Sequence, residues 1–178
     1  MYDKVGLLPY ITRMTQRLVH RGPNAGGVFA EDHIGLGHRR LSIIDLSEAA
    51  NQPMHDASGR YVMVYNGELY NYRELKAKLG HYPFRSDSDS EVVLAAFTKW
   101  GADCLRYFNG MFAIAIWDTR KKELFLARDR MGIRPLFYTE KNGSFIFGSE
   151  IKSLLEFPEV TATLSVKALS QVFTFWTT

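Results

Sequence analysis

The stretch of sequence that decides the fold is Tyr61-Val62-Met63-Val64-Tyr65-Asn66-Gly67-Glu68-Leu69-Tyr70-Asn71-Tyr72. Its first five residues are all apolar or aromatic, which predicts a strand covered on both faces. The strand is expected to end at Asn66-Gly67, because glycine permits a turn there and leaves its N–H open to a closely approaching ligand. The prediction is a rigid buried strand with polar groups at its end.

These polar groups indicate a site for acyl chemistry. The Gly67 N–H and the Asn66 carboxamide are neutral donors, and such donors stabilise a negative tetrahedral oxygen when they are aimed at it in advance. Glu68 adds a carboxylate suited to a substrate ammonium group. The alternative interpretation is a β-turn that leads into a helix, since Asn-Gly is a common turn pair and Asn71 and Glu74 have capping-box spacing.

The length and composition indicate one soluble globular domain. The chain has 178 residues, of which 46% are hydrophobic and 23% are charged, and these are ordinary values for such a domain. Its longest apolar run, residues 111–117, is far shorter than the roughly 20 residues that span a bilayer. The N-terminus has no signal-peptide pattern. We therefore expect a cytoplasmic protein with no membrane partner.

Charge and cysteine content exclude further classes. The 22 Lys and Arg exceed the 19 Asp and Glu by three, and the basic residues are scattered among acids, so no nucleic-acid partner is expected. A single cysteine, Cys104, excludes an internal disulfide and a multi-thiolate metal site. It is interpreted as a small core residue. The five histidines include no pair at helical ligand spacing, and no metal is predicted.

The N-terminal part is expected to form one amphipathic helix and two short strands. Apolar residues repeat at three and four positions from Leu7, and the helix is expected to stop near His20. Strands at 28–30 and 34–37 follow a glycine-rich loop. Arg40 comes next. An isolated arginine is usually a solvated surface charge, but a buried one needs a carboxylate partner, which guanidinium binds through two parallel hydrogen bonds.

The middle of the chain is expected to be helical. Helices are predicted at 72–79, from Ser88 to Gly101 and at 103–108. Ser88 and Glu91 have capping-box spacing. Asp89 falls in the first turn of its helix, where the helix dipole favours a negative charge, so it has a structural interpretation as well as a functional one.

The C-terminal part is expected to form an antiparallel meander of four strands, at 111–118, 123–128, 136–140 and 144–148. Further helices are predicted from Ser149 to Leu155 and from Ser165 to Phe175. Helices grouped between blocks of antiparallel strands indicate an α+β fold, with two sheets stacked between helix layers.

Six motifs stand out along the chain: His20-Arg21-Gly22-Pro23, Gly37-His38-Arg39-Arg40-Leu41-Ser42-Ile43-Ile44-Asp45, Tyr65-Asn66-Gly67-Glu68-Leu69-Tyr70-Asn71, Ser88-Asp89-Ser90-Glu91-Val92, Asn109-Gly110-Met111-Phe112-Ala113 and Ala127-Arg128-Asp129-Arg130-Met131-Gly132-Ile133-Arg134-Pro135-Leu136. Together they resemble the glutamine-hydrolysing domain of glutamine-dependent asparagine synthetase, a class II glutamine amidotransferase with the N-terminal-nucleophile hydrolase fold. The resemblance covers His20 to about Leu155. The segment after Arg40 favours this branch over amidotransferases that act on sugar phosphates.

The resemblance implies a role for each matching residue. Arg40 would bind the carboxylate of free glutamine, and backbone groups near Leu41 and Ile43 would hold the same end of the ligand. The ammonium group would be received by Asp89 and Glu68. The oxyanion hole for the side-chain amide would be formed by Asn66 and Gly67.

The resemblance also implies a fold, and the chain differs from the family at its N-terminus. The fold would be a single domain over residues 1–178, with two mainly antiparallel sheets between helix layers (αββα). The family nucleophile is a cysteine at the mature N-terminus, whose α-amine assists proton transfer, whereas this chain begins Met1-Tyr2-Asp3-Lys4. Cys104 is expected within a helix and carries no free amine. We therefore expect that the domain as printed lacks its first strand and is inactive alone.

The function implied by the resemblance is that of a glutaminase domain, which releases ammonia from glutamine for the synthesis of asparagine. A synthetase domain would follow roughly where Thr178 stands and would convert aspartate to asparagine with ATP and Mg²⁺. No cofactor is expected in residues 1–178. The partners implied are L-glutamine, the synthetase domain of the same longer chain and, for assembly, a second copy in a homodimer.

Two other functions stay open. The chain could be a non-catalytic module that binds glutamine and reports its supply, since Arg40, Asn66, Gly67, Glu68 and Asp89 are all present. Alternatively it could be a structural fragment, in which the loss of a strand leaves unpaired backbone groups that associate with other chains.

Overall fold

The computed structural model describes residues 3–176. The α-helices are α1 (Lys4–Gln16), α2 (Tyr72–Lys78), α3 (Asp89–Trp100), α4 (Ile151–Leu154) and α5 (Val166–Phe175), and short 3-10 helices lie at Val19–Arg21, Glu48–Ala50 and Gly101–Tyr107. The strands are β1 (Ala25–Glu31), β2 (Ile34–Arg40), β3 (Met54–His55), β4 (Tyr61–Leu69), β5 (Gly110–Asp118), β6 (Glu123–Arg128), β7 (Phe137–Lys141) and β8 (Ser144–Gly148). Within the described range, no helix combines the length and apolar character needed to cross a membrane.

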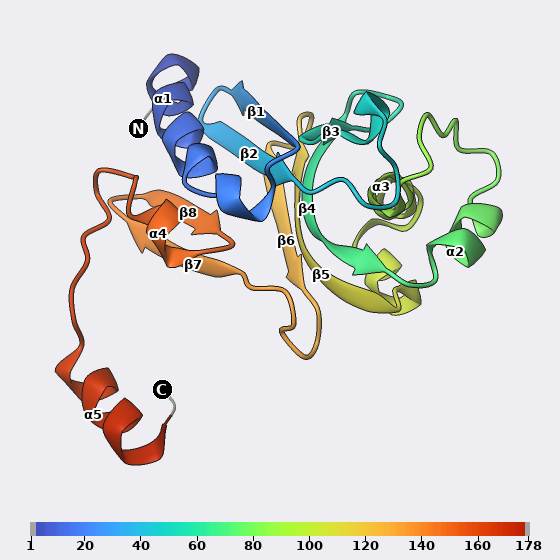
Figure 1. Cartoon of the computed structure of the whole chain (residues 1–178). Helices are drawn as coiled ribbons and strands as arrows, with labels where there is room; N and C mark the ends of the chain where they lie inside the picture. The colour runs from blue at the N-terminus through green and yellow to red at the C-terminus, as the bar shows by residue number, and fades with distance from the viewer. Residues whose placement is uncertain (1–2, 177–178) are drawn as a thin grey trace.

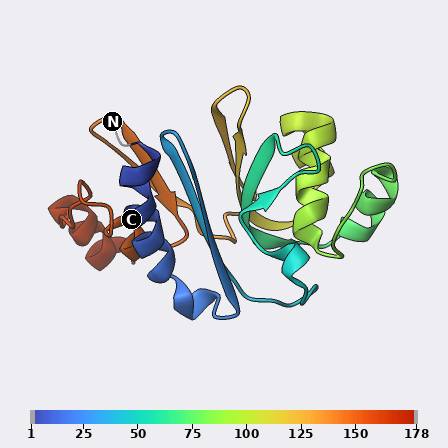
Figure 2. The same ribbon diagram turned by 90° about the horizontal axis from the view of Figure 1, so that it is seen from above.

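The strands form three antiparallel sheets, with orders β1-β2, β3-β4-β5-β6 and β7-β8. Figure 1 shows α1 beside β1-β2 and above β7-β8, while α3 and α2 lie on the other side of the four-stranded sheet. Seen from above, helix, strands, strands and helix follow one another across the molecule (Figure 2). The α+β class predicted from the sequence is confirmed.

The prediction of one four-stranded meander is wrong. All four strands exist, but β5 and β6 extend the sheet of β4, and β7 and β8 form a separate hairpin. The cause lies in the segment that joins β6 to β7. The Asp129 carboxylate accepts hydrogen bonds from the N–H groups of Ile133 (2.9 Å) and Arg134 (3.0 Å), and Arg128 Nε donates to the Arg134 carbonyl (2.6 Å). These bonds fold the segment into a compact loop instead of a hairpin turn.

Strand β4 does not end at Asn66-Gly67 as predicted. It continues to Leu69, with Gly67 opposite Phe112 of β5. A side chain at Gly67 would overlap the Met111 carbonyl and approach the Tyr65 ring to 2.7 Å. The glycine therefore serves close packing inside a strand rather than a turn.

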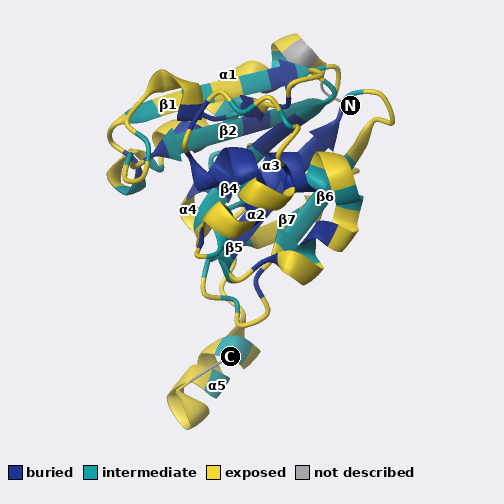
Figure 3. Ribbon diagram, turned by 90° about the vertical axis from the view of Figure 1, so that its right-hand side faces the viewer, coloured by how far each residue is buried: buried dark blue, intermediate teal, exposed yellow. Residues whose placement is uncertain are grey.

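The main core lies between α3 and the four-stranded sheet. Figure 3 shows most of α3 buried, and residues 89–96 form its buried part. Its apolar residues pack against fully buried side chains of β4 and β5, among them Met63, Ile114 and Ile116. Each such side chain contributes about 1.5–3 kcal/mol relative to an exposed position. This core gives the organising strand a rigid support.

Helix α1 covers both small sheets. Side chains at Gly35 and Gly37 of β2 would overlap Ile11 and Thr15, so α1 lies directly on that strand. The same helix contributes Leu7 and Met14 to a second core cluster with Ile146 of β8, Leu154 and Phe157. Yet β2 pairs only with β1, and β8 pairs only with β7. Each of these two strands consequently has one edge without a strand partner among the described residues.

Candidate active site

A cavity of about 740 Å³ lies between the open strands β2 and β8 and the inner face of the four-stranded sheet. Its polar end contains all seven residues predicted from the sequence, namely Arg40, Leu41, Ile43, Asn66, Gly67, Glu68 and Asp89. The structure thus brings together side chains from β2, the loop after it, β4 and α3. Leu41 and Ile43 are 55% and 75% exposed, which places them at the rim.

The Arg40 guanidinium is buried but forms no salt bridge within residues 3–176. Nη1 donates to the Ser47 carbonyl (2.7 Å) and to Asn51 Oδ1 (2.8 Å), and Nη2 donates to the Asp45 carbonyl. Of the five N–H donors of guanidinium, two are thus left over. A buried cation held only by neutral oxygens is suited to a ligand carboxylate.

The Asp89 carboxylate is 6% exposed at the start of α3. Its Oδ2 accepts hydrogen bonds from the Leu69 N–H (2.9 Å) and from the Tyr65 hydroxyl (2.9 Å). Burial raises the pKa of Asp89, although both bonds counteract the effect. Asp89 therefore differs from an ordinary first-turn carboxylate, because it reaches back from α3 to β4.

The predicted capping box at this helix is wrong. Ser88 does cap α3, accepting from Ser90 N–H (3.3 Å). Glu91, however, accepts from Ser86 N–H (2.7 Å) and Arg85 N–H (3.0 Å) instead of Ser88 N–H. The chain before the helix curls around Glu91, which fixes the approach of Asp89 to β4.

The Gly67 N–H lies on the open edge of β4. The backbone N–H and carbonyl of Phe112, opposite Gly67, bond to Asp129 rather than to β4 (3.2 and 2.8 Å). Gly67 and Phe112 are therefore a non-hydrogen-bonded pair, and the Gly67 N–H points away from β5. On the same edge, Tyr65 N–H donates to Gln52 and Leu69 N–H donates to Asp89. The N–H between them has no partner among the described residues.

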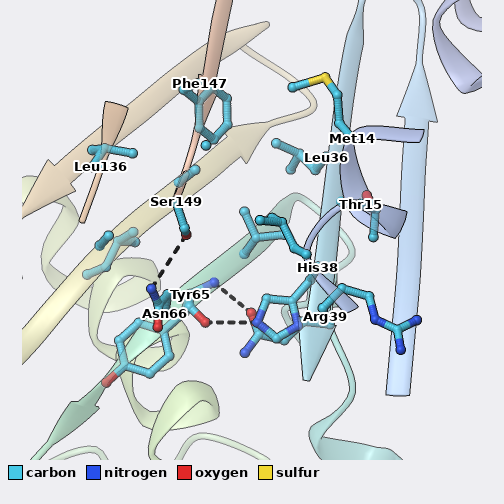
Figure 4. A pocket seen from close by; sticks show the side chains of 18 of the residues that line it. Met14, Thr15, Leu36, His38, Arg39, Tyr65, Asn66, Leu136, Phe147 and Ser149 are labelled. Atoms are coloured by element: carbon cyan, nitrogen blue, oxygen red, sulfur yellow. Dashed lines mark hydrogen bonds between the residues drawn. The ribbon is translucent and has the colours of Figure 1, made fainter. Parts of the chain in front are cut away.

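The Asn66 carboxamide points across the cavity. Its Nδ2 lies 3.5 Å from Ser149 Oγ, a long contact that joins β4 to the end of β8 (Figure 4). Ser149 was predicted to start a helix, but α4 begins at Ile151 and leaves Ser149 in the cavity wall. Glu68 is exposed at the mouth.

His38, Tyr65 and Gln52 also line the cavity and were missed as site residues. His38 Nε2 lies 3.1 Å from the Tyr65 carbonyl, which fixes Nε2 as the protonated nitrogen (Figure 4). Burial, together with Arg40 and Arg39, lowers the pKa of His38 to about 4. The signal was present in the sequence, because His38 is two residues from Arg40 and alternation places both on one strand face.

Cys104 lies outside this site. It is 1% exposed in the 3-10 helix Gly101–Tyr107, within the main core. Burial raises its pKa to about 12. The thiol is thus neutral and inaccessible at physiological pH, as the sequence interpretation of a core cysteine predicted.

The other end of the cavity is apolar. Leu36 of β2 and Phe147 of β8 extend into it from opposite sides (Figure 4), over Val64 and Trp117 of the four-stranded sheet. Apolar side chains and two open strand edges therefore enclose a space that a free amino acid alone does not fill.

The fold and this cavity define the class of protein as a class II glutamine amidotransferase domain. The chain belongs to that family, since residues 3–178 match the family described as glutamine amidotransferase domain. It is similar to the B. subtilis protein named asparagine synthetase [glutamine-hydrolyzing] 3, with 43% identity over 166 residues that cover 90% of this chain and 27% of the relative.

Other relatives carry different names. The Gibberella zeae protein named amidase chry2 is 45% identical over 79% of this chain and 21% of its own length. A putative asparagine synthetase [glutamine-hydrolyzing] 2 of Methanocaldococcus jannaschii is 40% identical over 84% of this chain and 32% of its own length. The chain therefore spans between about a fifth and a third of these curated relatives.

The fold is also found in a solved structure of glutamine phosphoribosylpyrophosphate amidotransferase from B. subtilis, complexed with ADP and GMP. The TM-score is 0.68 with 22% sequence identity, and the match covers 82% of this chain and 40% of that chain. This similarity supports the fold and no finer assignment.

Proposed function

We propose that this chain is the glutaminase domain of a glutamine-hydrolysing asparagine synthetase. The observation that carries the proposal is a pair of buried, opposite charges in one cavity. Within residues 3–176, Arg40 has no ion-pair partner, and the side chains that bond to Asp89 use only its Oδ2. Free L-glutamine offers a carboxylate to the first and an ammonium group to the second. Glu68 adds a second negative charge at the mouth.

The amide end of the ligand would meet the open edge of β4. In this proposal the Gly67 N–H and the Asn66 carboxamide stabilise the negative oxygen that forms when the side-chain carbonyl is attacked. Both groups belong to a strand held between β5 and the main core, so they are positioned before the substrate arrives.

The nucleophile would come from outside residues 1–178, because Cys104 is buried in the core. One further strand between β2 and β8 would pair with both open edges and join the small sheets into one, giving the two-sheet αββα sandwich of N-terminal-nucleophile hydrolases. In this proposal a cysteine stands at the start of that strand, as the resemblance to asparagine synthetases implies.

This cysteine would hydrolyse glutamine in two steps, formation of a thioester and its cleavage by water. Its sulfur bonds to the side-chain carbonyl carbon of glutamine, the C–N bond breaks, and the nitrogen leaves as ammonia with the thiol proton. Water then cleaves the thioester to give glutamate and the free thiol. In the longer protein, a synthetase domain with ATP and Mg²⁺ would use the ammonia to convert aspartate to asparagine.

A glutamine-binding module without catalysis is the second candidate. The observation in its favour is that the binding groups are present while the sole thiol of the printed chain is inaccessible. The two candidates share the cavity and differ only in the supply of a nucleophile.

Calorimetric titration with L-glutamine tests the shared part of both proposals. We expect saturable binding by the printed chain, and an affinity at least about 30-fold lower for Arg40→Met, because a buried charge-assisted contact is lost. The matched control Arg106→Met, whose side chain is 80% exposed, should bind like the parent. Absence of binding, or equal affinity for Arg40→Met, would overturn the proposal.

Ammonia release separates the candidates. The printed chain should release none from glutamine. The same chain extended at its N-terminus by a strand that begins with cysteine should do so, and the Cys→Ala version should not. Binding without turnover by the extended chain would favour the non-catalytic module, and turnover by the printed chain would show that the nucleophile has been misassigned.

A further inference from the structure

Tyr65 is held at three points by three separate segments. Its N–H donates to Gln52 Oε1 (2.6 Å), its carbonyl accepts from His38 Nε2 of β2 (3.1 Å), and its hydroxyl donates to Asp89 Oδ2 of α3 (2.9 Å). The side chain is 5% exposed. β3 is only two residues long, so the side chains of Gln52 and His38 replace a strand partner at this point of β4.

The ring of Tyr65 runs alongside Gly67. A Cβ placed on Gly67 would lie 2.7 Å from Cε2 and 2.8 Å from Cζ of this ring. The missing side chain of Gly67 is thus what allows the ring to pass and its hydroxyl to reach Asp89. Tyr65 therefore contacts both Gly67, through its ring, and the buried carboxylate of Asp89, through its hydroxyl.

The two oxygens of Asp89 are used unequally. Oδ2 accepts hydrogen bonds from the Tyr65 hydroxyl and the Leu69 N–H, and no other side chain in residues 3–176 donates to the carboxylate. The Ser90 backbone N–H adds a further interaction that lowers the pKa of Asp89. Burial and the charge of Asp89 raise the pKa of Tyr65 above its usual value. The phenol therefore stays protonated and is a permanent donor.

We propose that Tyr65 is a positioning residue that selects for the α-ammonium group of glutamine, by holding the Asp89 carboxylate through its Oδ2 at the wall of the cavity. This inference rests on the proposed function. Tyr65 acts through Asp89 and does not itself contact the substrate. Its hydroxyl fixes the carboxylate, while its ring supports Gly67.

Other charged groups near this pair set its response to pH. Glu68 of β4 raises the pKa of Asp89, Arg134 lowers that of Tyr65, and His38 contacts the Tyr65 backbone. The Tyr65 hydroxyl lowers the pKa of Asp89. Since ammonium binding requires the ionised carboxylate, loss of this hydroxyl moves the pH at which binding fails upward.

The test compares two ligands on the printed chain and on Tyr65→Phe, which keeps the ring beside Gly67. L-glutamine has the ammonium group, and 4-carbamoylbutanoate is the same molecule without it. We expect Tyr65→Phe to weaken glutamine binding about tenfold at pH 7, to move its acid limit to higher pH, and to leave 4-carbamoylbutanoate binding unchanged. Tyr61→Phe, at the other end of β4, is the matched control.

A double-mutant cycle with Asp89→Asn guards against a folding artefact. In that background Tyr65→Phe should cost no further affinity, because the carboxylate it orients is absent. Equal weakening of both ligands, or unchanged glutamine affinity, would overturn the inference while leaving the proposed function intact. If the unaltered chain binds no glutamine, the proposed function is overturned and this inference with it.

Discussion

At the scale of single residues, three polar or backbone groups of the site lack the partner or side chain that residues elsewhere in a fold usually have. Gly67 lacks a side chain, Arg40 lacks an ion-pair partner within the described range, and one N–H of β4 lacks an acceptor. Unpaired polar groups of this kind are costly in a folded protein and concentrate where a ligand completes them.

Gly67→Ala provides a prediction at this scale. The added Cβ overlaps the Met111 carbonyl, which is backbone and cannot rotate away. We expect the free energy of unfolding to fall by about 1–3 kcal/mol, measured by urea denaturation, and glutamine binding to be lost. Gly80→Ala is the control, because its Cβ meets only Ala77 O at an ordinary 3.4 Å. Equal stability of the two variants would contradict the packing argument.

Sequence reasoning at the residue scale identified groups by their chemistry, and the structure brings all seven to one cavity. It could not identify partners distant along the chain. Ser149 is 83 positions from Asn66 and entered the cavity because its helix starts later than its capping pattern indicated. Tyr65 was read only as part of a buried strand, since nothing local shows that its hydroxyl reaches Asp89.

At the scale of elements, the hairpin β5-β6 is fixed by the Arg60–Asp118 pair. Arg60 Nη2 donates to Asp118 Oδ2 (2.6 Å) and Nε donates to both carboxylate oxygens (3.0 Å). The same carboxylate accepts from the N–H groups of Arg120 and Lys121 in the turn (3.0 Å each). The bond to Arg60, ahead of those to the turn, lowers the pKa of Asp118 to about 2.

This pair predicts a pH-dependent stability. Because the folded pKa is lower than the unfolded value of 3.8, the contribution is complete above about pH 4 and is lost as the pH falls through about 2. Asp118→Asn should therefore cost about 1–3 kcal/mol at pH 7 and much less near pH 2, measured by denaturant unfolding. Asp103→Asn, in a pair that is 70% and 80% exposed, should change stability little. A constant difference across this range would contradict the assignment.

The positions of helices and strands were better predicted than the pairing of strands into sheets. Hydrophobic periodicity located α1, α3, β5 and β6 to within a few residues, because each buries a continuous face. The sheet order was not accessible, since it depends on the Asp129 loop that directs β7 away from β6. Likewise the turn predicted at Asn66-Gly67 failed because β5 continues the ladder past it.

At the scale of the whole molecule, the two small sheets should be the least protected part of the strand framework. In a two-stranded sheet only alternate N–H groups face the partner strand, whereas β5 is paired on both sides. We expect amides in 34–40 and 144–148 to exchange with deuterium faster than those in 112–117, measured by mass spectrometry of the printed chain. Equal protection would show that the open edges are covered in solution.

The C-terminal helix extends from the rest of the molecule. Figure 1 shows α5 standing away from the other elements, and its apolar residues Phe173 and Phe175 are 78% and 68% exposed. The sequence predicted this helix from its Ser165 cap, which accepts from Ala168 N–H (3.2 Å). Its position could not be predicted, because a capped amphipathic segment specifies a helix and not what it packs against.

The bridging role of α1 has a mechanical consequence. Among the described residues, no backbone ladder joins β2 to β8. The two strands are connected by side chains of α1 and by a cluster in which Leu36 and Phe147 pack over Trp117. Because side-chain packing constrains a separation less strictly than ladder hydrogen bonds do, we expect the distance between β2 and β8 to vary more than that between paired strands. A strand or ligand that filled this gap would restrict that variation, and we expect it to stiffen the wall that carries His38 and Arg40.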